Sequence, residues 1–575
     1  MTKDKAVRPL ARQLKAQFTR GCVPLLCAAG AVTVAAGTLD LIVSWIMQQL
    51  IDAASGAPGA LPIGVLARIS GVFMLLCAAI FVLQMATRPR YIERALRQYR
   101  SFAMEKLLEK NIASFRQAGT ADYLSALTND VTVIENDYLA QRFTMLEKGI
   151  TFIGALALML WYSPLMTAIA AGLTLLPFIA SLPAGDRLQT AEKTVSAKNR
   201  DLTAALNDLL GGFAVVKSFQ AERRIWRLFT QSDGALEREK CRRCRLKALI
   251  GAAGAIAGLA AQLGVFLIGA YRALTGQGLT AGAVILFVDL MDLMIEPVAA
   301  LPGLLSARRA ALALVDKLAD ALEQKAPPTA GLPLTAVRQS IRLEDVSFSY
   351  DGERPVLQGI TAEFTSGKAY AIVGGSGSGR STLFSLLTGE NSNFGGQILI
   401  DGIPIRDIDP AALYDVMGTI AQNVFVFNAS VRDNVTMFRD LPPEDTADAL
   451  RRAHLSALLT QRGEGYLCGE GGSGLSGGER QRIAIARCLL KRSSVLLADE
   501  ATAALDAETA HEVAEDLLSL SGMTRIIVTH TLERSLLSRY DGILVLRGGR
   551  IEECGTFDEL MAKKGYFYAL VTVAD

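Results

Sequence analysis

Residues 374–382 read Gly374-Gly375-Ser376-Gly377-Ser378-Gly379-Arg380-Ser381-Thr382. An apolar run at 369–373 precedes this stretch, and a helical pattern that begins at Leu383 follows it. A strand, a glycine-rich loop and a helix in this order are typical of a phosphate-binding loop. Glycines let backbone N–H groups approach the phosphates, and the helix N-terminus adds a favourable dipole. The stretch therefore predicts a nucleotide-binding α/β domain in which all nine residues of the stretch contribute to the nucleotide site.

The spacing from Gly374 to Gly379 and on to Ser381 is that of the Walker A motif, in which a lysine precedes the final serine or threonine. This chain has Arg380 in the place of that lysine. Arginine keeps the positive charge, but its longer, planar and forked side chain is not a conservative replacement at a tight phosphate site. Three interpretations stay open: a slow site in one half of a heterodimer, a substitution introduced to hold ATP, or an arginine that functions adequately.

The composition of the chain favours a membrane protein. With 575 residues the chain is too long for one core, since a domain typically has roughly 150 residues, and 51% of its residues are hydrophobic. The net charge of +2 gives no argument for a nucleic-acid partner. The eight cysteines are scattered and the chain has three histidines, which favours reduced thiols and no zinc site.

Six apolar stretches are long enough to cross a hydrocarbon layer about 30 Å thick. They lie at 23–50, 62–86, 141–161, 165–182, 248–271 and 279–301. The connections at 87–140 and 183–247 are helical in pattern and rich in lysine and arginine, which places them in the cytoplasm. We predict an all-α, six-helix transmembrane domain at 21–322 in the plasma (inner) membrane, with both termini cytoplasmic. A basic helix at 1–20 is expected on the cytoplasmic leaflet.

The sixth stretch contains three acids on one helical face, Asp289, Asp292 and Glu296. Carboxylates inside a membrane are costly and face a water-filled cavity or a basic partner. The acids therefore form either a cation-preferring wall of a transport pathway or structural pairs with a nearby arginine or a partner chain. Asp40 in the first stretch is a weaker candidate of the same kind.

A linker rich in proline and glycine at 323–340 leads into a soluble α/β domain at 341–575. Five further motifs follow the glycine-rich loop. They are Ile420-Ala421-Gln422-Asn423-Val424-Phe425-Val426-Phe427, Leu475-Ser476-Gly477-Gly478-Glu479-Arg480-Gln481-Arg482, the apolar run 495–498 with Asp499-Glu500, Ala504-Leu505-Asp506 and Val528-Thr529-His530. In this order they resemble the motifs of ABC ATPases, and the segments 115–131 and 209–222 resemble the intracellular segments of ABC transporters. The chain is identified as resembling a half-size ABC transporter with the exporter-type (type IV) fold.

The resemblance implies a role for each motif, with ATP and Mg²⁺ as cofactors. Tyr350 would stack on adenine, Glu500 would polarise the attacking water, and His530 would contact the γ-phosphate. The residues expected at the metal are Ser381, Gln422 and Asp499, of which Gln422 also reaches the water. Asp499 suits the metal on chemical grounds, because Mg²⁺ prefers oxygen ligands. The residues expected near ATP at the dimer interface are Ser476, Gly477, Gly478 and Asp506.

The resemblance also implies how the protein works. Two such chains, as a homodimer or a heterodimer, would sandwich two ATP molecules, and ATP hydrolysis would drive alternating access of a membrane cavity. The expected activity is an ATPase coupled to transport, most simply export of a lipophilic, peptidic or cationic small molecule. The alternatives are an importer of a siderophore-like compound and a nucleotide-holding subunit of a heterodimer that Arg380 makes slow.

Overall fold

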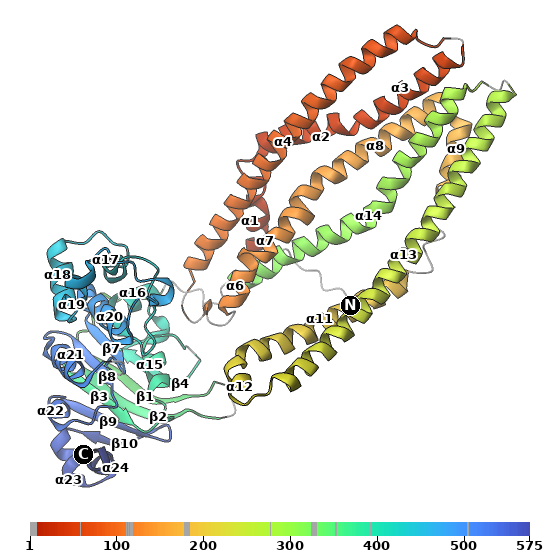
Figure 1. Ribbon diagram of the computed structural model, residues 1–575. Helices are drawn as coiled ribbons and strands as arrows, with labels where there is room; N and C mark the ends of the chain where they lie inside the picture. Colours follow the sequence, from red (N-terminus) through yellow and green to blue (C-terminus); the bar gives the residue numbers. More distant parts are fainter. Residues whose placement is uncertain are drawn as a thin grey trace. The chain divides into compact units, whose positions relative to one another are not determined.

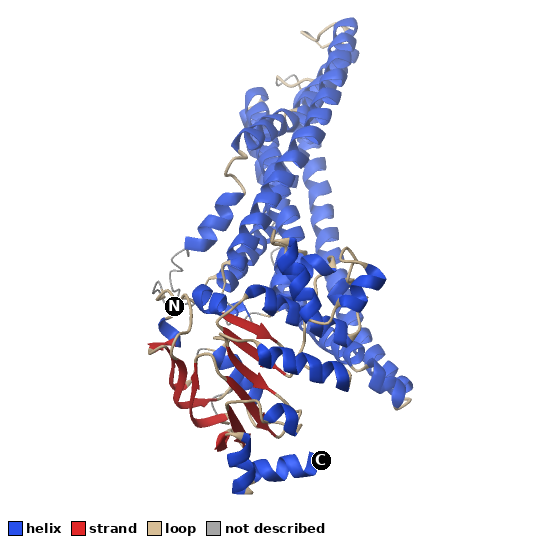
Figure 2. Cartoon of the chain, turned by 90° about the vertical axis from the view of Figure 1, so that its left-hand side faces the viewer, coloured by secondary structure: helices blue, strands red, loops and turns tan. Residues whose placement is uncertain are grey.

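The computed structural model describes residues 9–57, 59–110, 112, 114–115, 119–176, 185–275, 278–323, 331–350, 354–391, 393–502 and 505–574. The chain divides into two compact units. The first comprises Met1–Glu109 and Gly119–Glu323, and the second comprises Lys110–Ala118 and Gln324–Asp575. Within the described residues the first unit is helical, whereas the second contains all the strands (Figures 1 and 2). The predicted combination of an all-helical unit and an α/β unit is confirmed.

Several helices of the first unit are longer than the predicted membrane spans and continue past them. Its elements are α1 (Pro9–Gln17), α2 (Val23–Gly37), α3 (Leu39–Ala54), α4 (Ile63–Leu108), α6 (Thr120–Leu127), α7 (Asn129–Ile134), the π-helix η1 (Glu135–Ala140), α8 (Gln141–Tyr162), α9 (Pro164–Leu173), α11 (Gly185–Gly211), α12 (Phe213–Ser218), α13 (Glu222–Leu274) and α14 (Ala281–Leu322). The longest, α4 and α13, have 46 and 53 residues and run without a break (Figure 1).

Four helical stretches of the described chain are long and apolar enough to cross a membrane. They are Val23–Ala54, Ile63–Leu108, Thr120–Tyr162 and Glu222–Leu274. The predicted span at 165–182 falls partly on α9 and partly outside the described residues. The predicted span at 279–301 lies on α14, where the three acids interrupt the apolar run. The number of six spans therefore stays a prediction.

Two acids of α14 have partners on neighbouring helices. Glu296 forms an ion pair with Lys148 of α8, and Asp292 accepts a hydrogen bond from Gln262 of α13. These contacts favour the structural interpretation of both acids, although the partners are not the arginines expected from the sequence. Pairing lowers the cost of placing a carboxylate in an apolar bundle, because its charge or lone pairs are satisfied.

The N-terminal helix α1 is packed on protein. Its residues Ala11 and Leu14 are buried, it lies against α4 and α14, and Lys15 forms an ion pair of 2.6 Å with Asp316 of α14. Its apolar face is therefore already covered by helices. Whether the basic face of this segment lies on the cytoplasmic leaflet stays a prediction.

A buried carboxylate at the end of α3 caps the start of α14. Asp52, which is 3% exposed, accepts hydrogen bonds of 2.9 Å from the Thr280 hydroxyl and the backbone N–H of Gly282. It also accepts a hydrogen bond from Gln48, whose side-chain oxygen accepts one of 3.0 Å from Tyr162. An acid at a helix N-terminus satisfies free N–H groups and complements the helix dipole. The network therefore ties α3, α8 and α14 together.

We expect Asp52→Ala to destabilise the helical unit by about 1–3 kcal/mol, because it leaves buried donors without an acceptor. The measurement is the thermal unfolding midpoint of the purified protein in detergent. Asp201→Ala, at an exposed ion pair of α11, serves as the matched control and is expected to unfold with the parent. An Asp52→Ala midpoint equal to that of the parent would show that the cap contributes nothing.

Two sheets form the centre of the second unit. The six-stranded sheet has the order β10-β9-β3-β8-β7-β6, and the four-stranded sheet has the order β2-β1-β4-β5. The strands are β1 (Ser340–Phe348), β2 (Leu357–Thr365), β3 (Ala369–Gly374), β4 (Gly395–Ile400), β5 (Ile403–Pro404), β6 (Met417–Ile420), β7 (Val495–Asp499), β8 (Thr524–Val528), β9 (Gly542–Arg547) and β10 (Arg550–Gly555). Strands β6, β7, β8, β3 and β9 run parallel to one another, and β10 pairs with β9 in the antiparallel direction.

The central strand β3 is buried on both faces. Ala371 and Val373 belong to one hydrophobic core, whereas Tyr370 and Ile372 belong to another. Alternate residues of a strand point to opposite faces of a sheet, so a strand covered on both sides is apolar throughout. This arrangement explains why the run before the glycine-rich loop contains no charged residue.

The helices of the second unit surround these strands. They are α15 (Arg380–Leu387), α16 (Pro410–Val416), α17 (Val431–Thr436), α18 (Pro443–Arg452), α19 (Ser456–Arg462), α20 (Gly477–Lys491), α21 (Ala507–Ser519), α22 (Arg534–Leu537), α23 (Phe557–Lys563) and α24 (Tyr566–Ala574), with 3-10 turns η3 (Ile405–Asp407) and η4 (Glu470–Gly472). Because the carboxyl ends of parallel strands meet at one edge of the sheet, the residues that follow β3, β7 and β8 lie together.

Parts of the predicted linker and of the first cytoplasmic segment make contacts within this unit. Leu334 and Val337 are buried in the core that contains β1, so the last part of the linker packs on the nucleotide-binding unit. The backbone N–H of Ile112 donates to the hydroxyl of Tyr414 over 3.5 Å. Burial raises the pKa of the Tyr414 hydroxyl, which therefore stays protonated near neutral pH.

Candidate nucleotide site

The loop between β3 and α15 requires glycine at particular positions. A Cβ atom on Gly374 would lie 2.3 Å from the carbonyl oxygen of Leu546 and 2.8 Å from the Ser378 hydroxyl. Gly379, the N-cap of α15, has a φ of 99°, which side chains rarely adopt. The backbone therefore passes close to its neighbours and turns sharply into the helix.

This geometry is suited to phosphate. Helix α15 begins at Arg380, so the N–H groups of its first turn, which includes Ser381 and Thr382, have no acceptor inside the helix. Ser376 and Gly377 are exposed at the tip of the loop. The Ser378 hydroxyl is buried without a hydrogen-bond partner among the described residues. Such an unsatisfied group is expected where a ligand supplies the missing bond.

The carboxylate of Asp499 lies at the end of β7, two strands from the loop. Its Oδ1 atom is buried and has no hydrogen-bond partner in the described part of the chain. Burial raises the pKa of Asp499, and a hydrogen bond to the Ser381 side chain partly opposes this shift. A buried carboxylate oxygen beside a serine hydroxyl is the kind of donor set that Mg²⁺ prefers. The two residues therefore fit the expected metal.

The next residue, Glu500, has an unusual backbone and a well-held side chain. Its φ is 52°, a conformation that costs energy in a residue other than glycine. The backbone N–H donates to Val528 over 3.0 Å, and the carbonyl accepts a 2.8 Å bond from the Gln481 side chain. The carboxylate lies 2.6 Å from Nε2 of His530 and accepts a 2.7 Å bond from Gln422. Contacts from several segments thus hold the strained backbone in place.

Arg380 lies across the ends of the same strands. Its side chain is 8% exposed, and Nη2 lies 2.7 Å from Nε2 of His530 and 3.7 Å from Oε1 of Glu500. Nη1 lies 3.3 Å from Nδ1 of His530 and donates to the carbonyl of Thr529 over 3.4 Å. A ring nitrogen either donates or accepts, so Nε2 of His530 cannot bond to both Arg380 and Glu500 at once. The arginine and the glutamate therefore compete for this histidine.

The remaining predicted residues lie at element ends. Tyr350 follows β1, is 67% exposed and has its hydroxyl 3.3 Å from that of Thr382. Ser476 caps α20, where its hydroxyl accepts from the backbone of Glu479. Asp506 caps α21, and the hydrogen bonds from Thr509 hold the pKa of its carboxyl below the usual range. Among the described residues, no hydrogen bond joins these caps to the glycine-rich loop.

The structure brings together most of the residues predicted at the catalytic centre. Arg380, Gln422, Glu500 and His530 form one connected cluster, beside Asp499 and Ser381. The amide nitrogen of Gln422 is committed to Glu500, so only its oxygen is available to a metal. Sequence reasoning missed Gln481, although this residue lies within the motif that begins at Leu475 and its position there was a usable signal.

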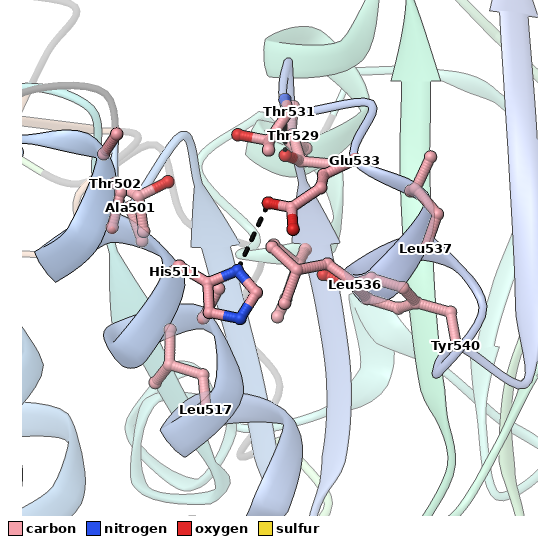
Figure 3. A pocket seen from close by; sticks show the side chains of 15 residues that line it. Ala501, Thr502, His511, Leu517, Thr529, Thr531, Glu533, Leu536, Leu537 and Tyr540 are labelled. Carbon is pink, nitrogen blue, oxygen red and sulfur yellow. Dashed lines mark hydrogen bonds and ion pairs between the residues drawn. The ribbon is translucent and has the colours of Figure 1, made fainter. Parts of the chain in front are cut away.

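A cavity of about 220 Å³ lies next to this cluster, between α21 and the segment that follows β8. Figure 3 shows His511 of α21 pointing toward Glu533, and their side chains lie 3.2 Å apart. Thr529 and Thr531, which flank His530, line the same cavity. This contact therefore ties the loop that contains His530 to α21.

Comparisons with known proteins agree with this geometry. Residues 357–503 match the family described as ABC transporter, and residues 26–298 match the family described as ABC transporter transmembrane region. A relative from Alkalilimnicola ehrlichii named ATP-dependent lipid A-core flippase is 30% identical over 570 residues, which cover 97% of this chain and 94% of that protein. The chain belongs to the ABC transporter family.

Two further comparisons extend this assignment. The mycobactin import ATP-binding/permease protein IrtB of Mycolicibacterium thermoresistibile is 36% identical over 318 residues, 54% of each chain. The structure of a bacterial Atm1-family ABC exporter with ATP bound has the same fold, with a TM-score of 0.81, 23% identity and coverage of 96% of this chain and 98% of that one. With a transmembrane region and an ATPase region in one chain, the protein is a half-size ABC transporter, which binds ATP and couples its hydrolysis to transport across a membrane.

Proposed function

We propose that this ABC transporter is one half of an exporter whose ATP site lies at the ends of β3, β7 and β8. The observation that carries the proposal is the connected cluster of Arg380, Gln422, Glu500 and His530 beside the buried, unsatisfied carboxylate of Asp499. These groups lie where a phosphate held by the loop would meet a water molecule.

The side chains divide the chemistry between them. Ser381 and Asp499, with the oxygen of Gln422, would hold Mg²⁺, which neutralises phosphate charge when it is bound. Glu500 accepts a proton from water while Gln422 holds its carboxylate in place, and His530 donates to the γ-phosphate. The N–H groups of the loop and of α15 bind the remaining phosphate oxygens. Each of these roles uses a group that the structure already holds at the strand ends.

The dimer completes the site in this proposal. Ser476, Gly477 and Gly478 begin α20, so their N–H groups and the helix dipole are suited to a phosphate presented by the partner chain. Asp506 would contact the partner at the same interface. The short helix α12 and the turn after it expose Phe213 and Phe219, and exposed aromatic side chains of this kind are typical of a protein contact. The partner is either a second copy or a different half-transporter.

Export is the favoured direction of transport. The flippase relative matches almost the whole chain, whereas the mycobactin importer matches about half of it. The cargo class stays as expected from the sequence, a lipophilic, peptidic or cationic molecule. The positive-inside distribution of lysine and arginine supports placing both termini and the ATPase unit in the cytoplasm.

Reconstituted proteoliposomes provide the test of this function. Spin labels at the outer ends of α3 and α4 of both protomers are expected to change their separation when ATP and vanadate trap the transition state, because closing of the ATP site drives the helical units. If the distances stay unchanged although ATP is hydrolysed, hydrolysis is not coupled to movement of the helices, and the proposal is contradicted.

Arg380 determines how fast this site turns over. We expect Arg380→Lys to raise the rate of ATP hydrolysis about tenfold, because a compact ammonium fits the phosphate cradle without the fork of a guanidinium. The assay uses the chain purified alone, with Arg342→Lys on an exposed strand position as control. Rapid hydrolysis by the parent and no gain in Arg380→Lys would favour an arginine that functions adequately and remove the nucleotide-holding alternative.

The aromatic ring of Tyr350 is the expected adenine contact. We expect Tyr350→Ala to weaken ATP binding about tenfold, since stacking of a base on an aromatic ring is worth about 1–3 kcal/mol. Tyr350→Phe keeps the ring and removes the contact with Thr382, so it is the matched control and should bind ATP like the parent. Equal weakening in both variants, measured by equilibrium binding, would assign the effect to the hydroxyl instead.

A further inference from the structure

The side chain of Arg380 contacts the residues proposed to catalyse hydrolysis. The guanidinium is buried and reaches both ring nitrogens of His530, the carboxylate of Glu500 and the carbonyl of Thr529. All of these groups follow β7 or β8, whereas Arg380 is the first residue of the helix after β3. One cation thus connects three strand ends.

The shape of the guanidinium makes this connection possible. A lysine offers its donors from one atom, but the planar fork of arginine presents donors in separate directions. Two of them face the two nitrogens of His530, and one of these also faces Glu500. Since the Glu500 side chain is 11% exposed, solvent and salt screen the attraction between the charges only weakly. Glu500 therefore has a cationic partner supplied by its own chain.

A phosphate held by the loop would compete for the same cation. Arginine binds phosphate through two parallel hydrogen bonds, and this geometry cannot be combined with the contacts to both nitrogens of His530. Binding of the nucleotide must therefore offset the loss of the contacts with Glu500 and His530. A negative charge on Glu500 would therefore oppose ATP binding through its attraction to Arg380.

We propose that Arg380 is a positioning residue that links ATP binding to the release of Glu500. In the structure its guanidinium bridges Glu500 and His530, and ATP binding transfers the guanidinium to the phosphates. The transfer removes the positive charge beside the carboxylate, which makes Glu500 a better acceptor for a proton from water, and it ends the contact of the arginine with His530. This inference rests on the proposed function, since it assigns the order in which groups of the same site become available.

A double-mutant cycle tests the link. The full chain in lipid nanodiscs is compared with Glu500→Gln, Arg380→Lys and the double variant, and the Kd of trinitrophenyl-ATP is measured in EDTA so that hydrolysis does not contribute. We expect Glu500→Gln to tighten binding about tenfold in the parent chain, within the usual range of coupling energies between charged groups in contact, and less than about twofold in the Arg380→Lys background. If Arg380 only stabilised the fold, Glu500→Gln would change the Kd by the same factor whether residue 380 is arginine or lysine.

Each outcome of the cycle has one interpretation. Equal effects of Glu500→Gln in both backgrounds would overturn the link while leaving the ATP site intact. Failure of all four chains to bind the nucleotide would overturn the proposed function and the link with it. Arg380→Gln replaces Arg380→Lys if the lysine variant does not fold, as judged by thermal unfolding. Glu500→Gln is then again expected to change the Kd by less than about twofold, because a neutral glutamine at position 380 does not attract the Glu500 carboxylate.

Discussion

Replacing Glu500 with glutamine is expected to lower the rate of ATP hydrolysis about 100-fold or more while the chain still binds ATP. The structure holds this carboxylate between Gln422 and His530, within hydrogen-bond distance of both. Glutamine has nearly the same shape but cannot accept a proton from water, so only the general-base contribution is lost. The strained backbone of Glu500 is left unchanged by this substitution.

The measurement is the steady-state ATPase rate of the reconstituted protein, with ATP binding determined on the same sample. Glu444→Gln, on the exposed first turn of α18, removes an equal charge outside the cluster and is expected to hydrolyse ATP at the parental rate. Hydrolysis by Glu500→Gln at more than about a tenth of the parental rate would mean that another group accepts the proton.

Asp499→Ala is expected to abolish hydrolysis to a similar degree and, in addition, to remove the effect of Mg²⁺ on ATP affinity. Its Oδ1 atom is a buried carboxylate oxygen without a hydrogen-bond partner in the described chain, and the Ser381 side chain lies beside the carboxyl group. Without this ligand the metal would lose the charge that holds it in a site of otherwise neutral donors. The parent should bind ATP more tightly with Mg²⁺ than in EDTA, whereas the variant should bind equally in both.

Titrations of ATP in the presence of Mg²⁺ and of EDTA check this expectation. Asp558→Ala, at the exposed start of α23, is the control for loss of one acid from the same unit. If Asp499→Ala kept the full effect of Mg²⁺, the metal would be bound by other residues, and the assignment of Ser381 and Asp499 would be wrong.

The sequence predicted the nucleotide-binding unit well because its signals are local. The left-handed turn at Gly379 is a property of that residue's own backbone, so the glycine there is a signal that the sequence carries by itself. The apolar helices were equally evident, since a membrane-spanning helix is a long uninterrupted run. The partners of Asp292 and Glu296 were not predictable, because helices α8, α13 and α14 place residues of distant segments side by side.

By itself, the sequence determined that the chain has a phosphate-binding loop, apolar helices and an ordered set of ATPase motifs. The tertiary structure alone decided that Arg380 meets Glu500 and His530, although more than a hundred residues separate it from either. The physical reason is the strand order: β8 lies between β3 and β7, so parallel pairing brings the residues that follow all three to one edge. A sequence motif shows which residues adjoin Arg380 along the chain. Which charged groups its side chain contacts depends on which strands pair in the sheet.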